Sequence, residues 1–84
     1  MKHAGSRALD QIEPILIELR KIAGLKEKSR GVFYRGAAAF LHFHEDPAGM
    51  FADVRIGKDF ARFRATTRAE IASMLRRVRR ELNS

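Results

Sequence analysis

The sequence predicts an α+β domain in two layers, with an N-terminal helix, a four-stranded antiparallel β-meander and a C-terminal helix. Apolar residues recur at helical spacing near both ends of the chain, and between these segments they alternate as in strands. A chain of 84 residues is long enough for one modest core. We expect residues 1–8, which have few apolar anchors, to form a flexible N-terminus and residues 9–84 to form the single domain.

The first helix is predicted from apolar positions that recur between Leu9 and Ile22. Pro14 has no backbone N–H and is tolerated in a first turn, so we expect the regular helix to begin near Glu13. Gly24 stands where a left-handed residue commonly follows a helix. The sequence therefore predicts a helix that ends just before Gly24.

The second helix has a clear start. Thr67 and Glu70 have the spacing of a capping box, in which each side chain accepts a hydrogen bond from the other residue's backbone N–H. Behind them follows an apolar stripe made of Ile71, Met74, Leu75, Val78 and Leu82. We expect this stripe to pack on the sheet.

Four strands are predicted between the helices, at about 31–35, 38–44, 51–56 and 59–64. Gly57-Lys58 has glycine at the first central position, as a two-residue type II′ turn requires, and Gly36-Ala37 could serve in the same way. These turns favour a meander of antiparallel hairpins.

The turns and the apolar alternation together predict the register. In the last hairpin Asp53 faces Arg62. Matching the apolar faces of the two middle strands places His42 opposite Asp53 and His44 opposite Phe51. The predicted sheet thus has a row of polar residues formed by His42, Asp53 and Arg62.

The first hairpin is expected to pair Val32 with Leu41 and Phe33 with Phe40. One sheet face then holds Val32, Tyr34, Ala39, Leu41, Phe43, Ala52, Val54, Ile56, Ala61 and Phe63. The other face holds Phe33, Arg35, Phe40, His42, His44, Phe51, Asp53, Arg55, Phe60, Arg62 and Arg64. Because the first face is apolar, we expect the helices to cover it and the second face to be the working surface.

The phenylalanines of the second face predict a homodimer. Phe33, Phe40, Phe51 and Phe60 would together expose a larger apolar patch than monomers usually have. A C2 dimer that buries the patch is the commonest solution. The alternative is that one of the two helices covers this face instead.

The histidines predict a binding site for a divalent metal or a small ligand. His42, His44 and Asp53 offer two imidazoles and a carboxylate on one face, and Arg62 would complete a ligand site. In the simpler interpretation Arg62 and Asp53 form a cross-strand ion pair and the histidines are ordinary polar residues. No nucleophile or phosphate-binding loop accompanies His42, which favours a non-enzymatic role.

The charge suggests a third function. The chain has a net charge of +7, which attracts nucleic acid or acidic proteins. Arg76, Arg77, Arg79 and Arg80 gather near the C-terminus as candidate phosphate contacts, although a solvated helix face with charges that suit the helix dipole explains them more simply. The absence of cysteine and of a long apolar run favours a cytoplasmic protein that does not span a membrane.

The segments Gly31–Gly36, Phe40–Asp46 and Phe51–Val54 together resemble a group of small bacterial α+β proteins of unknown function. The resemblance covers roughly residues 12–80. It implies a helix, a compact antiparallel sheet and a closing helix, and it implies no activity. The order of elements is also loosely similar to the N-terminal domain of TfoX-type competence regulators, an analogy of fold order alone.

Overall fold

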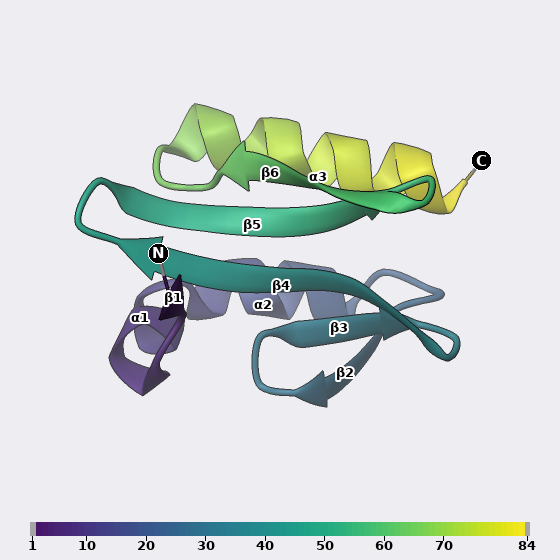
Figure 1. Cartoon of the computed structure of the whole chain (residues 1–84), viewed down its shortest axis with the longest axis horizontal. Coiled ribbons are helices and arrows are strands. Elements are labelled where there is room, and N and C mark those ends of the chain that lie inside the picture. The colour runs from purple at the N-terminus through teal and green to yellow at the C-terminus, as the bar shows by residue number, and fades with distance from the viewer. Residues whose placement is uncertain (1, 84) are drawn as a thin grey trace.

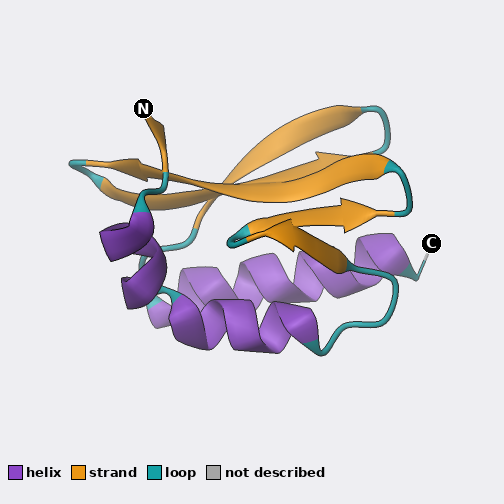
Figure 2. Ribbon diagram, turned by 90° about the horizontal axis from the view of Figure 1, so that it is seen from below, coloured by secondary structure: helices purple, strands orange, loops and turns teal. Residues whose placement is uncertain are grey.

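The computed structural model of the chain describes residues 2–83 and has the two layers that the sequence predicts (Figure 1). The helices are α1 (Ser6–Gln11), α2 (Glu13–Arg20) and α3 (Arg68–Leu82). The strands are β1 (Lys2–His3), β2 (Lys26–Ser29), β3 (Val32–Arg35), β4 (Ala38–Asp46), β5 (Gly49–Ile56) and β6 (Asp59–Arg64). Figure 2 shows α2 and α3 side by side on one face of the sheet, with α1 at one end. We call the opposite sheet face the outer face.

The N-terminal helical segment is divided at Ile12. Pro14 occupies the first turn of α2, which begins at Glu13 as predicted. The predicted end was wrong, because α2 stops at Arg20 and the chain continues in turns. Gly24 has a φ of +94° and therefore still takes up the left-handed backbone conformation expected of it.

The C-terminal helix α3 confirms the predicted capping box. The Thr67 hydroxyl accepts a hydrogen bond from the backbone N–H of Glu70, and the Glu70 carboxylate accepts one from the backbone N–H of Thr67. Met74 and Val78 of the predicted stripe are fully buried against the sheet. None of the helices formed by residues 2–83 has both the length and the apolar character needed to cross a bilayer.

The sheet has the order β2-β3-β4-β5-β6, and β1 pairs with the end of β4. The predicted pairings of His42 with Asp53, His44 with Phe51 and Asp53 with Arg62 are confirmed. Gly57 has a φ of +65°, as the first central residue of a type II′ turn must. The last two hairpins are therefore aligned as the sequence predicts.

The first hairpin has a different register, which corrects the predicted faces. Phe33 pairs with Leu41 and Tyr34 pairs with Ala39, so Phe40 is an extra residue in β4. Such a β-bulge lets two consecutive side chains oppose one partner residue. As a result Phe33 and Phe40, which were expected on the outer face, are 0% and 1% exposed and belong to the core.

Two strands lie outside the four that were predicted. The β2 sequence Lys26–Ser29 has no apolar alternation, and it pairs with β3 as a charged edge strand. In β1, Lys2 pairs with Glu45 and His3 with His44. Part of the segment expected to be flexible thus forms a short strand beside β4.

The core lies between the sheet and the two long helices. Leu16 and Leu19 of α2 and Val78 of α3 are completely buried, as is Val54 at the centre of the sheet. Burying a side chain of this size stabilises a protein by about 1.5–3 kcal/mol. With both helices on this side, the alternative in which one helix covers the outer face is wrong (Figure 2).

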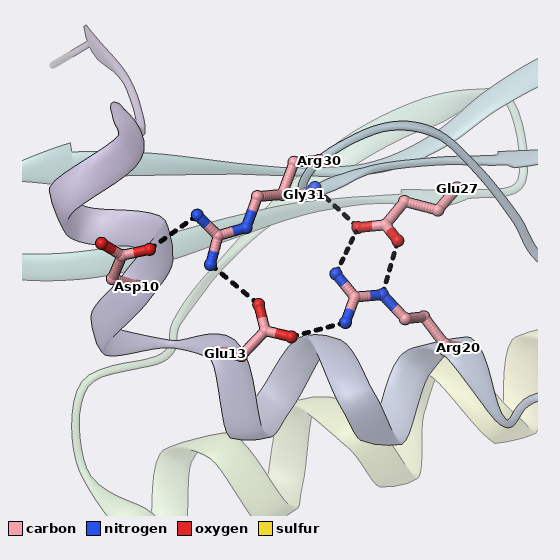
Figure 3. A network of polar contacts seen from close by, with 6 residues as sticks. All are labelled: Asp10, Glu13, Arg20, Glu27, Arg30 and Gly31. Atoms are coloured by element: carbon pink, nitrogen blue, oxygen red, sulfur yellow. Dashed lines mark hydrogen bonds and ion pairs between the residues drawn. The ribbon is translucent and has the colours of Figure 1, made fainter.

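A chain of ion pairs connects the helical segment to the β2–β3 hairpin (Figure 3). Glu13 accepts hydrogen bonds from Arg20 at 2.6 Å and from Arg30 at 2.8 Å. Arg30 also donates to Asp10, and Arg20 donates through two nitrogens to Glu27. Since Glu27 also accepts from the backbone N–H of Gly31, this network fixes the hairpin against α1 and α2.

We expect Glu27→Gln to destabilise the protein by about 1 kcal/mol at pH 7 and by less at pH 3. Hydrogen bonds from Arg20 hold the pKa of the Glu27 carboxyl below its usual 4.5. A lowered pKa means that this stabilisation is present above pH 4.5 and is lost as the pH falls through the folded-state value. Urea unfolding of both proteins at the two pH values tests this.

The matched control is Glu18→Gln, which removes the exposed pair with Lys21. We expect it to cost only about 0.3 kcal/mol at pH 7. An effect of Glu27→Gln that persists unchanged at pH 3 would contradict a role of the charged network.

Candidate metal centre

The three histidines of the chain meet on the outer face. His42 and His44 are two residues apart in β4, and their side chains therefore share a face. The pairing of β1 with β4 places His3 directly opposite His44. Two strands thus contribute three imidazoles to one spot, which we call the histidine cluster.

The rings of the histidine cluster are close together. One ring nitrogen from each residue lies within 4.8 Å of the others. The ring of His3 is centred 4.6 Å from that of His44 and 5.5 Å from that of His42, and the two β4 rings are 5.0 Å apart. This spacing is compact enough for one ion to reach all three side chains after small rotations.

Several nitrogens of the cluster are buried without a hydrogen-bond partner. Among residues 2–83, Nδ1 of His42 and both ring nitrogens of His44 accept and donate no hydrogen bond. His44 is only 9% exposed. A buried polar atom without a partner costs about 1–3 kcal/mol, and such atoms in a folded protein call for a ligand, an ion or water.

Asp53 lies beside the cluster and is held by Arg62. The Arg62 guanidinium donates from Nε to Oδ1 at 2.8 Å and from Nη2 to Oδ2 at 2.9 Å. These hydrogen bonds keep the pKa of the Asp53 carboxyl below its usual value, although the residue is only 8% exposed. Asp53 is therefore ionised at neutral pH.

Asp53 also contacts His44. The distance from its Oδ2 to His44 Nε2 is 3.0 Å, without the alignment of a hydrogen bond. The register pairs Asp53 with His42. The imidazole nitrogen nearest to the Asp53 carboxylate nevertheless belongs to His44, the diagonal neighbour of Asp53 on β4. The carboxylate is thus placed to orient His44.

His42 is suited to bind a cation as the neutral imidazole. Burial lowers the pKa of His42, and the attraction of Asp53 only partly opposes this effect. An imidazole must be unprotonated to donate its lone pair to a metal. Protons therefore compete only weakly with a metal ion for His42 at pH 7.

The structure brings together two of the three predicted metal ligands and adds a third that the sequence did not predict. His42 and His44 belong to the cluster, and Asp53 has both oxygens engaged by Arg62. The third imidazole comes from His3, in the segment expected to be flexible. The only signal for His3 in the sequence is that it is the one other histidine of the chain.

The predicted dimer face is reduced by the bulge in β4. Phe33 and Phe40 are in the core, so only Phe51 and Phe60 remain on the outer face. A guanidinium group lies over each ring, that of Arg64 at 5.3 Å from the centre of Phe51 and that of Arg55 at 4.5 Å from the centre of Phe60. The homodimer stays a prediction, supported by a much smaller patch than the sequence suggests.

Comparisons with other proteins offer no parallel for this site. No family model matches the chain, and no curated protein or solved structure matches it significantly. The resemblance to small bacterial α+β proteins therefore stays a prediction. The function has to be argued from the histidine cluster itself.

Proposed function

We propose that this protein binds a divalent transition-metal ion through His3, His42 and His44. The observation that carries the proposal is that one nitrogen from each of the three imidazoles lies within 4.8 Å of the others, while buried nitrogens of His42 and His44 lack hydrogen-bond partners among residues 2–83. Solvent-exposed histidines that merely decorate a sheet would satisfy these atoms with water.

The donor set favours zinc and its neighbours in the first transition row. Imidazole nitrogen suits Zn²⁺, Co²⁺, Ni²⁺ and Cu²⁺, whereas Mg²⁺ and Ca²⁺ prefer oxygen ligands. Zinc lies about 2.0–2.1 Å from each histidine nitrogen, so tetrahedral ligands are about 3.3 Å apart. The exposed His3, on a strand of two residues, is the side chain best able to move in and close this gap.

Asp53 and Arg62 would orient a ligand of the proposed site without binding the ion themselves. Histidine ligands of metals usually contact a carboxylate or carbonyl through the second ring nitrogen, which fixes the ring and increases its basicity. Asp53 lies 3.0 Å from Nε2 of His44, so Nδ1 is the nitrogen of His44 that remains to bind an ion. Arg62 keeps the carboxylate ionised and in place.

Three protein ligands leave one tetrahedral position for water or another molecule. Zinc sites that are purely structural are normally closed by four protein ligands, and sites with three protein ligands are open. The proposed site is therefore a binding site with access to solvent on the side of the exposed His3.

The prediction of a cytoplasmic protein is separate from this proposal and rests on the absence of cysteine.

Titration calorimetry with Zn²⁺ on chelator-treated, tag-free protein tests the proposal. We expect one ion per chain, and we expect His3→Ala to weaken binding at least ~100-fold, because loss of an outer partner alone costs ~10–100-fold. His3 is exposed, so its removal leaves the core intact.

Asp46→Asn is the control, since it removes a carboxylate near the β4–β5 turn and leaves the histidines unchanged. We expect it to bind zinc as the unaltered protein does. No saturable binding, or equal affinity after His3→Ala, would contradict the proposal.

A further inference from the structure

A second surface, far from the histidine cluster in the fold, is built from arginines of α3. A shallow groove of about 530 Å³ lies along this helix and the adjacent edge of β6. Its lining consists of Phe63, Ser73, Arg76, Arg77, Arg79 and Arg80. We call it the arginine groove, and Figure 1 shows α3 running alongside β6 at this edge.

The charges of the arginine groove are not neutralised within the protein. Among residues 2–83, no carboxylate lies within 4.0 Å of the guanidinium groups of Arg76, Arg79 and Arg80, and all three side chains are exposed. Arg77 has only a loose contact of 3.9 Å with Glu81, and its buried Nε has no hydrogen-bond partner among the described residues. The groove is therefore a concentration of positive charge that no nearby carboxylate neutralises closely.

Four arginines elsewhere in the protein are paired with carboxylates. Ion pairs of 3.1 Å or less are formed by Arg20, Arg30, Arg62 and Arg64. The carboxylates of α3 are also engaged: Glu70 caps the helix and pairs with Arg64, and Glu81 accepts a hydrogen bond from the backbone of Gly57. Of the two carboxylates of α3, Glu70 therefore faces away from the groove and Glu81 makes the loose contact with Arg77.

We propose that the arginine groove binds the phosphate backbone of double-stranded DNA. Several guanidinium groups that no carboxylate of residues 2–83 pairs with, in a groove lined by no carboxylate, are complementary to a polyanion. Arg76 and Arg80 are four residues apart, or about 6 Å along the helix axis. Each DNA strand carries a phosphate for every ~3.4 Å of the duplex axis, so arginines spread along α3 can contact more than one phosphate.

The structure favours a duplex over a single strand. Single strands are bound by stacking bases on open aromatic rings. The one aromatic ring that lines the groove, Phe63, is instead partly buried against the core. An exposed helix face fits the major-groove side of B-form DNA, whereas the deep and narrow major groove of duplex RNA does not admit a helix.

Fluorescence anisotropy with a labelled 20-base-pair DNA, measured in chelator at a series of KCl concentrations, tests this proposal separately from metal binding. We expect the logarithm of the association constant to fall linearly with the logarithm of the salt concentration, with a slope of about −3 to −4. Replacing Arg76, Arg79 and Arg80 together with glutamine should weaken binding more than tenfold at low salt. It should also reduce the slope by about 2–3.

The control removes the same charge elsewhere, through Lys26→Gln, Lys28→Gln and Lys58→Gln, all on exposed turns and edges. We expect this variant to retain at least half of the affinity. Equal losses in the two triple variants, no salt-dependent binding, or tighter binding of an RNA duplex of the same sequence would overturn the proposal. Circular dichroism confirms that each variant is folded.

Discussion

Phe40→Ala is expected to lower the free energy of unfolding by about 3–5 kcal/mol. The β-bulge turns the Phe40 ring into the core, where it is 1% exposed and belongs to one cluster with Leu16 and Val78. Removing a buried ring forfeits its transfer free energy and leaves a cavity that the surroundings fill only in part. For a domain of 84 residues this is a large fraction of the total stability, so the variant is measured by urea unfolding at low temperature.

Phe60→Ala is the matched control, because Phe60 was expected on the same face as Phe40. Its ring is 40% exposed, so we expect a loss of about 1 kcal/mol, which includes the contact with Arg55. Equal losses for the two variants would contradict the bulge and would return Phe40 to the outer face.

The second large effect concerns the histidine cluster. His44→Ala is expected to abolish measurable zinc binding at micromolar protein, because it removes a ligand and its buried nitrogens together. Asp53→Asn should reduce the affinity by only ~10–100-fold, since Asp53 acts through His44. Competition against a zinc-sensitive dye measures both constants on one scale.

Thermal unfolding with and without zinc separates binding from folding in these variants. Zinc that binds the native state should raise the melting temperature of the unaltered protein, by an amount that grows with zinc concentration. For His44→Ala we expect no increase, even where the metal-free variant is folded. A zinc-dependent increase in His44→Ala as large as in the unaltered protein would contradict the assignment of His44 as a ligand.

The sequence predicted the architecture because its strongest signals are local. A glycine at the start of the 57–58 turn, with matched apolar alternation on both sides, fixes the pairing of β5 with β6. The capping box at Thr67 likewise fixes the start of α3. Each of these features is decided within a few residues, and the structure confirms them.

The bulge in β4 could not be predicted because it is decided by packing. Phe33 and Phe40 both have high β-propensity, and alternation alone assigns them to one face. The core between sheet and helices has room for both rings, and burying them outweighs one interrupted step in the ladder. The prediction of four phenylalanines on the outer face was therefore wrong because it assumed unbroken alternation along β4.

Only part of the candidate site could be predicted from the sequence. His42 and His44 share a face wherever a strand is drawn through them, and the row to Asp53 and Arg62 followed from the register. His3 could not be added, because Lys2–His3 has no apolar pattern and pairs with β4 through the backbone. The ion pair of Lys2 with Glu45 and the hydrogen bond from the Gly5 N–H to Glu45 hold this strand in place.

The most direct test of the metal site is an anomalous-difference map at the zinc edge, from crystals of tag-free protein grown with zinc. The proposal predicts one peak on the outer face, about 2.0–2.1 Å from a nitrogen of each of His3, His42 and His44. A map without a peak at this position, or with zinc bound only to carboxylates elsewhere, would contradict it.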